Sequence, residues 1–426
     1  MPGQIILSIN AGSSSVKISV YQARSKDEDP KELAEAQIDG LTAPPPTLKY
    51  TRGDKKIKGK ELSDIDSQEK AFNYILDHLT SDSGLTELSN KEDIAFATHR
   101  VVHGGDYPGP QLLNKETYHH IEKLSDLAPL HNAGALTLVD AVFKILPKAT
   151  NIAFFDTSFH SSIPAHISTY PIDPHLAAKN KLRKYGFHGL SYSFITRSTA
   201  RFLQKPVEET NIIALHLGSG ASITAIHNGK SLDTSMGLTP LAGLPGATRS
   251  GSIDPSLVFH YTHDAGKLSP SSTKSLHITA AEQILNKESG WKALTGTTDF
   301  GTISSKAAQG DEKCTLAFDL MVDRILGFVA SYYVTLRGHV DAIVFAGGMG
   351  EKGSALRRAV IEGVNCLGFE MDEGKNEKPG EGVVEEITKG GARHRVLICK
   401  TDEQLEMARG CVAEAEKFEA QKNHGK

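Results

Sequence analysis

The sequence predicts an α/β fold made of two domains, and three observations lead to this prediction. At 426 residues the chain is too long for one simple hydrophobic core. Patterns typical of strands and of helices are mixed along its whole length. In each half, two apolar runs flank a loop of small residues: IILSINAGSSSVKISVY at residues 5–21 and NIIALHLGSGASITAIHNG at residues 211–229. The similarity of these two segments indicates a duplicated core.

The expected elements follow from local patterns. Clusters of aliphatic and β-branched residues predict strands, in chain order Ile5–Asn10, Val16–Tyr21, Ile94–Val101, Asn151–Phe155, Ile212–Leu217, Ser222–His227, Ala342–Phe345 and Arg395–Cys399. Apolar residues recurring every three or four positions predict helices, in chain order Gln68–Leu79, Ala133–Ile145, Tyr192–Phe202, Ala280–Asn286, Cys314–Leu336, Ser354–Val364 and Glu403–Lys417. Three polar stretches lack periodicity and are expected to be exposed embellishments: residues 24–31, 43–63 and 372–391.

Composition excludes several classes of protein. Hydrophobic residues make up 39% and charged residues 23% of the chain, as in ordinary globular proteins, and the net charge of −4 gives no reason to expect a nucleic acid or an anionic membrane as partner. The four cysteines are scattered without a C-x-x-C pair, which is typical of reduced thiols. The N-terminus resembles no signal or transit peptide. These features predict a cytoplasmic protein.

Loops of small residues at three places have the chemistry of a phosphate-binding site. Gly12 and Gly218 let the backbone approach a ligand closely, and neighbouring hydroxyls and amides can donate to its oxygens. A third Gly-rich turn, residues 347–353, precedes a helical pattern, and helix N-termini bind anions. Each loop alone would suit an ordinary turn, but the three together favour a nucleotide clamped between two similar domains. The P-loop and Rossmann motifs are absent from the sequence.

Several charged side chains stand beside glycines or at the ends of predicted elements. Arg100 and Arg249 lie in Gly-rich surroundings, where each would match carboxylate or phosphate oxygens or form an ordinary ion pair. Asp156 ends a strand and would hold Mg²⁺, orient a nucleophile or cap a helix. His188 would donate to a developing negative charge or serve a structural role. In the motif that opens the last predicted helix, Thr401 or Asp402 would cap the helix, or Glu403 would hold a metal.

These motifs, taken in order, resemble the acetate kinase family, which belongs to the superfamily of acetate and sugar kinases, Hsc70 and actin. The resemblance covers nearly the whole chain and rests on INAGSSSVK, HRVVHGG, APLHNAGAL, FFDTSFH, YGFHG, HLGSGASITAI, TRSGSIDP, FAGGMGE and TDEQL. It implies the two-domain ribonuclease-H-like fold of actin-like ATPases, with mixed sheets and an interdomain cleft. The N-terminal lobe would comprise residues 1–157 plus 403–426, and the C-terminal, nucleotide-binding lobe residues 158–402.

The resemblance also implies a reaction, the reversible transfer of the ATP γ-phosphoryl group to acetate, giving ADP and acetyl phosphate. Mg²⁺ or Mn²⁺ would assist, held through Asn10 and Glu403. The catalytic residues would be Arg100, Asp156, His188 and Arg249, and the acetate pocket would consist of Arg100, Val102, Leu130, Phe187 and Pro240. ATP or ADP would lie against Asn10, Ser13, Ser15, Lys17, His216, Gly218, Ser219, Gly220, Asp299, Phe300, Gly347, Gly348, Gly350 and Glu351. A homodimer is expected, because members of the family are usually homodimers.

The sequence departs from the common pattern of the family at Ser219, Ser252, Gly301 and Lys352, which leaves the nucleotide base preference open. The alternatives within the same class are a propionate or a butyrate kinase. A chaperone-like or sensory ATPase would share the fold. The arginine pair argues against this last alternative, since such a protein has no reason to hold a second anion.

Overall fold

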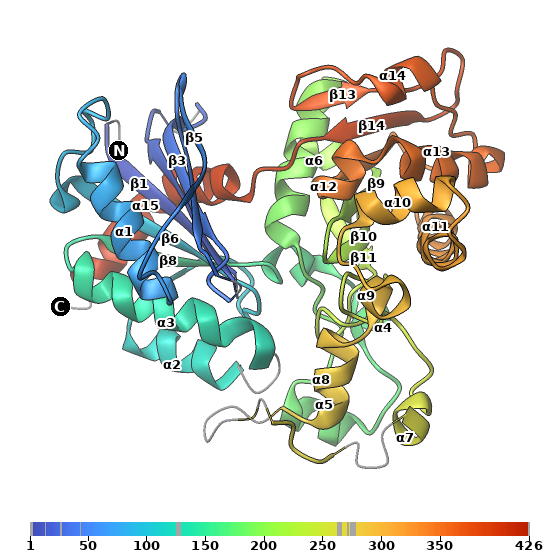
Figure 1. The fold of residues 1–426 in the computed structure, drawn as a ribbon, viewed down its shortest axis with the longest axis horizontal. Helices are drawn as coiled ribbons and strands as arrows, with labels where there is room; N and C mark the ends of the chain where they lie inside the picture. The colour runs from blue at the N-terminus through green and yellow to red at the C-terminus, as the bar shows by residue number, and fades with distance from the viewer. Residues whose placement is uncertain are drawn as a thin grey trace. The chain divides into compact units, whose positions relative to one another are not determined.

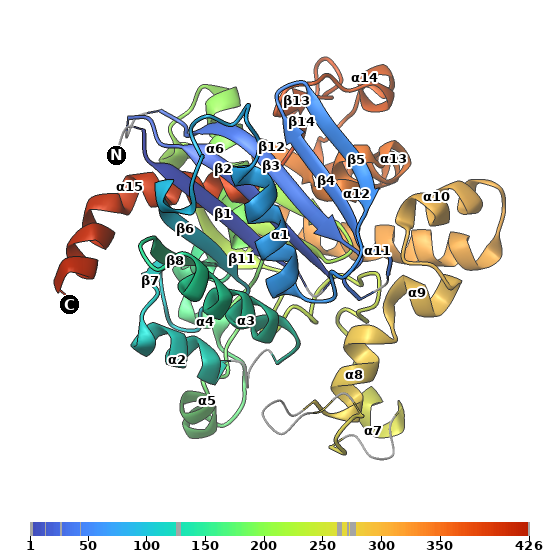
Figure 2. The ribbon, with the colours of Figure 1, turned by 60° about the vertical axis from the view of Figure 1, so that its left-hand side comes forward.

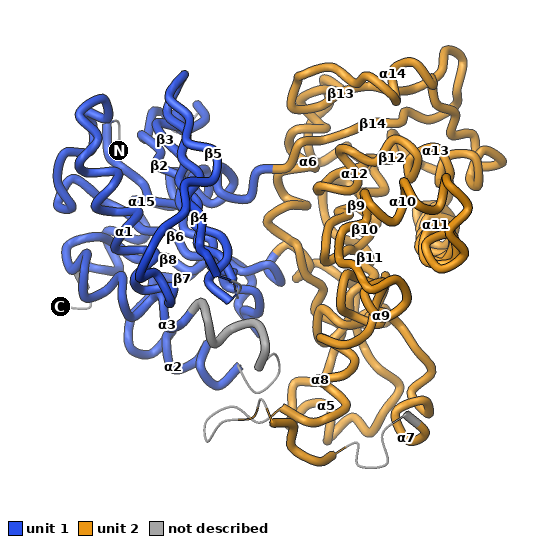
Figure 3. The backbone as a smooth tube through the Cα atoms, viewed as in Figure 1, with its two compact units in different colours: residues 1–158, 402–426 blue, residues 159–401 orange. Residues whose placement is uncertain are grey.

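The protein is described by a computed structural model that covers residues 3–12, 14–25, 28–42, 44–124, 129–261, 266–270, 272 and 278–424. The chain divides into two compact units, which Figure 3 colours separately. Unit 1 comprises residues 1–158 and 402–426, and unit 2 comprises residues 159–401. The assignment of nucleotide binding to the C-terminal lobe stays a prediction.

Unit 1 contains a mixed sheet with the strand order β5-β4-β3-β2-β1-β6-β8-β7 (Figure 1). Its strands are β1 (Ile5–Ala11), β2 (Ser15–Gln22), β3 (Lys31–Asp39), β4 (Thr47–Arg52), β5 (Lys55–Glu61), β6 (Ile94–Val101), β7 (Gln111–Leu112) and β8 (Thr150–Phe155). β1, β6 and β8 run parallel, whereas β1 to β5 pair antiparallel. Asn10, Arg100 and Asp156 therefore lie at the carboxyl ends of neighbouring parallel strands, where ligands of α/β proteins bind.

Successive side chains of β1 point to opposite faces of this sheet. Ile5, Leu7 and Ile9 are buried in a core shared with α1 (Gln68–Thr80) and α3 (Pro129–Ile145), and Figure 2 shows α1 lying across the strands. Ser8 points to the other face, where its hydroxyl donates to the Gln404 carbonyl at 2.9 Å. The Gln404 amide donates back to the Ser8 carbonyl at 3.1 Å. This pair anchors α15 (Glu403–His424), whose first residue is thereby held near the end of β1.

Unit 2 contains a second mixed sheet, β11-β10-β9-β12-β14-β13, whose order corresponds to β3-β2-β1-β6-β8-β7 of unit 1 without the hairpin β4–β5. Its strands are β9 (Ile212–Leu217), β10 (Ala221–His227), β11 (Lys230–Thr234), β12 (Ala342–Ala346), β13 (Val384–Glu386) and β14 (Arg395–Cys399). As β1 does in unit 1, β9 pairs antiparallel with one neighbour and parallel with the other. The α/β fold with two ribonuclease-H-like mixed sheets, predicted from the paired segments and the family resemblance, is confirmed.

Helices cover the sheet of unit 2 because their apolar residues recur at helical spacing. In α11 (Glu312–Thr335), Met321, Ile325 and Val329 recur every four residues and are fully buried in the core that includes β9 and β10.

The remaining α-helix of unit 1 is α2 (Lys115–Leu124). Those of unit 2 are α4 (Ala165–Ser168), α5 (Pro174–Asn180), α6 (Gly189–Leu203), α7 (Leu257–Tyr261), α8 (Ala280–Lys287), α9 (Gly290–Thr295), α10 (Phe300–Ala308), α12 (Gly347–Lys352), α13 (Ser354–Gly363) and α14 (Glu373–Glu377). Among the described residues, no helix is both long and apolar enough to cross a membrane.

Two of the three stretches expected to be exposed embellishments contain regular elements that were not predicted. Residues 43–63 contain the hairpin β4–β5, and residues 372–391 contain α14 and β13. The hairpin was not recognised because β5 is an exposed, lysine-rich edge strand, so that only Leu48 and Tyr50 of β4 reveal the alternation. Only the first residue of β3 falls in the third stretch, residues 24–31.

The buried carboxylate of Asp82 fastens the hairpin β4–β5 to the rest of unit 1. Asp82 is 8% exposed and accepts hydrogen bonds from the Tyr50 hydroxyl at 2.6 Å and from Arg52 Nε at 2.8 Å. Burial raises the pKa of Asp82, but the hydrogen bonds from Arg52 and Tyr50 outweigh that effect and hold the pKa well below its usual range. The carboxylate therefore stabilises the hairpin in its ionised form.

Candidate active site

The first cluster of predicted site residues lies in unit 1, at the carboxyl edge of the sheet. Arg100 Nη2 is 2.6 Å from Asp156 Oδ2, and Arg100 Nε is 3.1 Å from Asp156 Oδ1, so the pair is bidentate. Arg100 Nη1 lies 3.1 Å from Glu403 Oε2 and 3.5 Å from Asn10 Oδ1. The structure thus brings together four residues that are far apart in the sequence: Asn10, Arg100, Asp156 and Glu403.

Burial and charge together define the electrostatics of this cluster. The Asp156 side chain is 1% exposed, and that of Arg100 is 19% exposed. Burial lowers the pKa of Arg100, but Asp156 and Glu403 more than offset this effect and raise the pKa above its usual value. Arg100 is therefore always charged, and the ordinary ion pair considered from the sequence is present.

The helix that supplies Glu403 is capped by another residue. Asp402 Oδ1 accepts hydrogen bonds from the backbone amides of Gln404 at 3.1 Å and Leu405 at 2.9 Å. The Glu403 carboxylate is consequently available to Arg100 and to Asn10, whose Nδ2 lies 3.3 Å away. The described residues contain no group of three or more His, Cys, Asp or Glu side chains that could enclose a metal ion.

The remaining predicted residues of unit 1 differ in how far the structure describes them. Lys17 lies opposite Asn10 in the β1–β2 pair and forms an ion pair with Glu35 of β3 at 2.7 Å. Ser15 begins β2, whereas Ser13 lies outside the described residues. Val102, directly after β6, is half-buried. Leu130 belongs to α3, but its side chain lies outside the described part of the chain.

The second cluster of predicted site residues lies in unit 2, around the loop Gly218–Ser219–Gly220 between β9 and β10. A methyl group added at Gly220 would collide with Arg249 Nη2 and would lie 3.6 Å from His188 Nε2. Both Arg249 and His188, which the sequence singled out in this unit, therefore approach the same glycine. Only a residue without a side chain leaves the guanidinium room beside this loop.

Arg249 differs from Arg100 in having no counter-charge. Within the described part of the chain it forms no ion pair, although its side chain is half-buried. Burial lowers its pKa to about 10 from the ordinary 12.5, and no carboxylate acts against that change. A guanidinium that is removed from water without an anion is prepared to receive one from a ligand.

His188 is held by hydrogen bonding and ring stacking. It is the residue before α6, and its Nδ1 lies 2.8 Å from the Ser222 hydroxyl. Its ring stacks on that of His216, with the ring centroids 4.3 Å apart. His216 Nδ1 in turn lies 2.7 Å from the Ser191 hydroxyl. Nδ1 of His188 contacts Ser222, and Nε2 is the nitrogen that faces Gly220. The predicted pocket residues Phe187 and Pro240 are buried in the same unit.

A cavity of about 660 Å³ in unit 2 is large enough for a nucleotide. Of the residues predicted to bind the nucleotide, it is lined by Gly218, Ser219, Asp299, Phe300 and Gly348. Gly347, Gly350 and Glu351 do not line it, although they belong to α12, which supplies Gly348. The Gly347 amide donates to the Glu351 carboxylate at 3.1 Å.

The Asp299 carboxylate, predicted to contact the nucleotide, also caps a helix. It caps α10 by accepting hydrogen bonds from the Gly301 amide at 3.2 Å and the Thr302 amide at 3.0 Å. These bonds, with that from the Thr302 hydroxyl, lower its pKa. The carboxylate therefore fixes the start of a helix that lines the cavity.

Several residues that line the cavity were not predicted from the sequence. They are Trp291, Thr298, Ser304, Ser305, Ala308 and the segment 354–356, whereas Gly301 and residues 349, 352 and 353 lie in places that the sequence had linked to the nucleotide. The spacing of Gly301, Ser304, Ser305 and Ala308 was the available signal. Small residues at i, i+3, i+4 and i+7 form one face of a helix and leave space beside it.

Comparison with known proteins settles the relationship of the chain. The model of the acetokinase family matches residues 5–409. This protein belongs to the acetokinase family. A Neurospora crassa protein named probable acetate kinase is 57% identical, over 97% of this chain and 94% of the relative. The Borreliella burgdorferi acetate kinase is 38% identical, over 94% of this chain and 96% of the relative.

Solved structures of acetokinase-family proteins have the same fold. The Porphyromonas gingivalis acetate kinase superposes with a TM-score of 0.79 at 31% identity, covering 95% of this chain and 98% of that protein. A Francisella tularensis propionate kinase superposes with a TM-score of 0.83 at 33% identity, covering 96% of this chain and 98% of that protein. As an acetokinase-family protein, the chain is a carboxylate kinase, that is, a phosphotransferase.

Proposed function

We propose that this protein transfers the γ-phosphoryl group of ATP to acetate, reversibly, and so forms ADP and acetyl phosphate. The observation that carries the proposal is Arg249, a half-buried cation without a counter-charge among the described residues, beside the glycines of the β9–β10 loop. The names of the relatives at 57% and 38% identity support acetate as the acceptor.

The chemistry needs charge neutralisation more than it needs a base. A carboxylate is already a nucleophile at neutral pH, so no strong general base is required. The obstacle is the approach of one anion to another through a loose, in-line transition state. We propose that Arg249 and His188 Nε2 donate to the phosphoryl oxygens, and that Arg100 holds the acetate carboxylate. In its described contacts, Arg100 donates to Asp156, Glu403 and Asn10. One Nη2 hydrogen takes part in none of these contacts and can hold the acetate carboxylate.

The oxygen atoms in unit 1 fit a divalent cation. Asn10, Asp156 and Glu403 supply an amide oxygen and two carboxylates, and Mg²⁺ is usually held by one or two carboxylates together with water and substrate phosphates. We propose that Asn10 and Glu403 hold Mg²⁺ or Mn²⁺ and that Asp156 orients its waters. When bound, the ion would neutralise charge on the phosphates of ATP.

The cavity in unit 2 is the proposed site of ATP or ADP. The loop Gly218–Ser219–Gly220 would approach the phosphates, and the faces of α10 and α12 would border the nucleoside. Lys17 would reach the phosphates by exchanging its ion pair with Glu35 for one with the ligand. We propose that Ser15, like Ser13, donates to the same phosphates.

Propionate is the second candidate acceptor, favoured by the likeness to the Francisella propionate kinase. We propose that Val102, Leu130, Phe187 and Pro240 form the pocket for the methyl group of acetate. A pocket of that size rejects one additional methylene by only about 1–3 kcal/mol, so propionate should react, but less well.

An assay that traps acyl phosphate as a hydroxamate tests the proposed function. The purified protein would be incubated with Mg²⁺ and hydroxylamine, with acetate, propionate or butyrate as acceptor and with ATP, GTP or pyrophosphate as donor. We expect the largest kcat/KM with acetate and ATP, and equal amounts of ADP and hydroxamate. A larger kcat/KM with propionate would favour the second candidate. ATP hydrolysis without hydroxamate from any acid would contradict both.

We also propose that the protein works in the cytoplasm and as a homodimer. All four cysteines are unpaired, as in a reducing compartment. The homodimer rests on the family resemblance, because members of the family are usually homodimers. Light scattering coupled to gel filtration would give the mass, which is 45.9 kDa for one chain and twice that for a dimer.

A further inference from the structure

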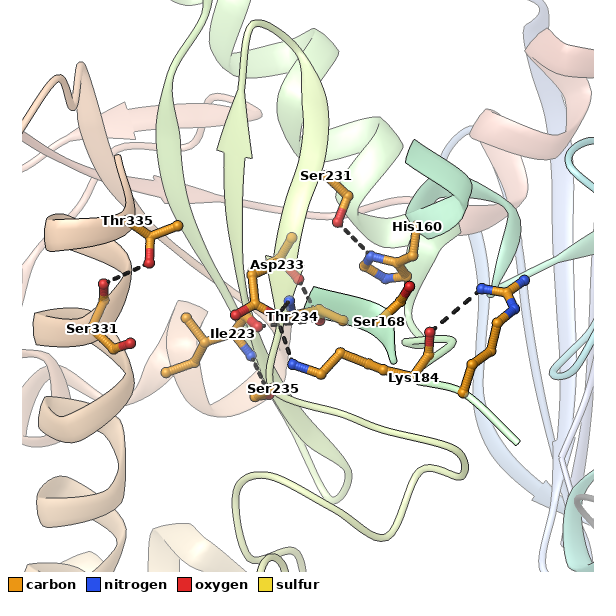
Figure 4. A network of polar contacts seen from close by, with 12 residues as sticks. His160, Ser168, Lys184, Ile223, Ser231, Asp233, Thr234, Ser235, Ser331 and Thr335 are labelled. Carbon is orange, nitrogen blue, oxygen red and sulfur yellow. Dashed lines mark hydrogen bonds and ion pairs between the residues drawn. The ribbon is translucent and has the colours of Figure 1, made fainter. Parts of the chain in front are cut away.

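His160, the last residue of the FFDTSFH motif, has no role in the chemistry proposed above. Its ring is 1% exposed and uses both nitrogens. Nδ1 lies 2.8 Å from the Ser231 hydroxyl, a contact drawn in Figure 4, and Nε2 lies 2.9 Å from the carbonyl oxygen of Phe187. Phe187 directly precedes His188, so this buried ring contacts the backbone of the turn that carries the proposed phosphoryl donor.

The partners of His160 determine where its proton lies. A carbonyl oxygen can only accept, so Nε2 carries the hydrogen and donates it to Phe187. Nδ1 is then an acceptor and receives the Ser231 hydroxyl hydrogen. Burial lowers the pKa of His160 to about 4, and the ring therefore remains neutral around pH 7. Around pH 7, Nε2 therefore always donates to Phe187 and Nδ1 always accepts from Ser231.

The backbone beside this contact has an unfavourable conformation. His188 has φ 60° and ψ 24°, the left-handed region, which costs a residue with a Cβ about 1–2 kcal/mol. Such a conformation persists only where the surroundings impose it. Gly186 has φ 79°, and a Cβ at this position would lie 2.8 Å from the His160 ring. The turn is therefore built to let His160 reach the Phe187 carbonyl.

Other contacts attach the beginning of the turn, and the hydrogen bond from His160 is one of the contacts at its end. The amides of Tyr185 and Gly186 donate to the Gly237 carbonyl at 3.0 and 3.2 Å. Lys184 forms an ion pair with Asp233 of β11 at 2.7 Å, as Figure 4 shows. These contacts hold residues 184–186. The hydrogen bond from His160 acts on the peptide group that immediately precedes the strained residue.

We propose that His160 is a positioning residue, which holds His188 in its left-handed conformation through the Phe187 carbonyl and thereby aims the His188 ring. The inference rests on the proposed function, in which His188 donates to the phosphoryl group. A displacement of about 1 Å in a catalytic group can lower the rate about a hundredfold. His160 thus acts on turnover without touching a substrate.

A matched pair of variants separates this role from general packing. In His160→Gln the amide nitrogen reaches the place of Nε2 and can still donate to Phe187. In His160→Asn the shorter amide reaches only the place of Nδ1, so it keeps the Ser231 contact and loses the Phe187 contact. Both variants are neutral amides. We expect kcat to fall about tenfold or more in His160→Asn and less than threefold in His160→Gln, with the KM for ATP changed less than twofold in both.

A double-mutant cycle with His188→Ala provides the second readout. If His160 acts through His188, His160→Asn should lower kcat in the native background and leave it unchanged in the His188→Ala background. A residue that only stabilises the fold would lower the melting temperature of both variants and would have equal effects on kcat in the two backgrounds. Equal effects, or equal kcat values for the Asn and Gln variants, would overturn the proposal.

The same measurements distinguish failure of this inference from failure of the proposed function. Absence of acyl phosphate from the unsubstituted protein would remove the proposed function, and this inference with it. An active protein in which His188→Ala lowers kcat, but in which the cycle is additive, would remove the inference alone. If His160→Asn does not fold, His160→Gln still decides, because a kcat reduced tenfold or more in that variant would contradict a role for the Phe187 contact.

Discussion

Replacement of Arg249 by methionine should separate activity from stability. Methionine keeps most of the volume of the side chain and removes the charge. In the free protein the guanidinium has no counter-charge among the described residues, and burial lowers its pKa to about 10. The difference from the ordinary value of 12.5 corresponds to about 3 kcal/mol that burial of the charge costs the folded state. Arg249→Met should therefore be as stable as the unsubstituted protein or more stable.

The effect on turnover should be opposite. Loss of one positioned donor to a developing negative charge typically costs about 3–4 kcal/mol, or roughly a hundredfold to a thousandfold in kcat. We would measure kcat by hydroxamate trapping and the free energy of unfolding by urea denaturation. Arg324→Met is a suitable control, because Arg324 lies in α11 with its side chain 53% exposed and should affect neither quantity.

Two results would refute this reasoning about Arg249. A variant with kcat within threefold of the unsubstituted protein would show that the guanidinium does not act on the reacting group. A variant destabilised by several kcal/mol would show that Arg249 has a structural partner and is not reserved for a ligand.

Three further predictions follow from the same contacts. Arg100→Met should destabilise the protein by about 3–5 kcal/mol in urea denaturation, unlike Arg249→Met, because it removes the bidentate guanidinium from the buried Asp156 carboxylate; equal stability of the two variants would contradict this. Gly220→Ala should fold normally but lower kcat at least tenfold, since the added methyl displaces the end of the Arg249 side chain; an unchanged kcat would be the contrary result. Asp82 has a pKa below the ordinary 3.8, so its stabilisation is present above that value and is lost as the pH falls further. Asp82→Asn should be about 2 kcal/mol less stable at pH 7 and should lose less stability between pH 5 and pH 2 than the unsubstituted protein; parallel pH curves would contradict this.

Much of the fold could be predicted because the central strands are buried and mostly apolar. Ile94–Val101, Ile212–Leu217 and Arg395–Cys399 have the predicted bounds, since each lies between two neighbouring strands and buries most of its side chains. Residues 43–63 were missed for the opposite reason. There the sheet ends in a lysine-rich edge strand, whose charges prevent pairing with other chains and also hide the strand pattern.

The candidate site was predictable in its residue types but not in its contacts. Gly-rich sequence marks Arg249 and the β9–β10 loop, because close approach of a side chain to the backbone requires glycine. Nothing in the sequence indicates that Arg100 has two carboxylate partners whereas Arg249 has none among the described residues, since the pairing of Arg100 depends on residues more than fifty positions away. The spacing of small residues in α10 was visible in the sequence, but that this face lines the same cavity as α12 became evident only once the helices were placed.

The central claim, that Arg249 and Arg100 serve two mutually repelling anions, is tested most directly by a crystal structure of the protein with acetyl phosphate and without a nucleotide, so that no transfer can occur. We predict that N–H groups of both guanidinium groups lie about 3 Å from oxygens of the bound acetyl phosphate. A structure in which Arg249 contacts only protein carboxylates, or in which Arg100 keeps all its donors on Asp156, Glu403 and Asn10, would contradict the claim.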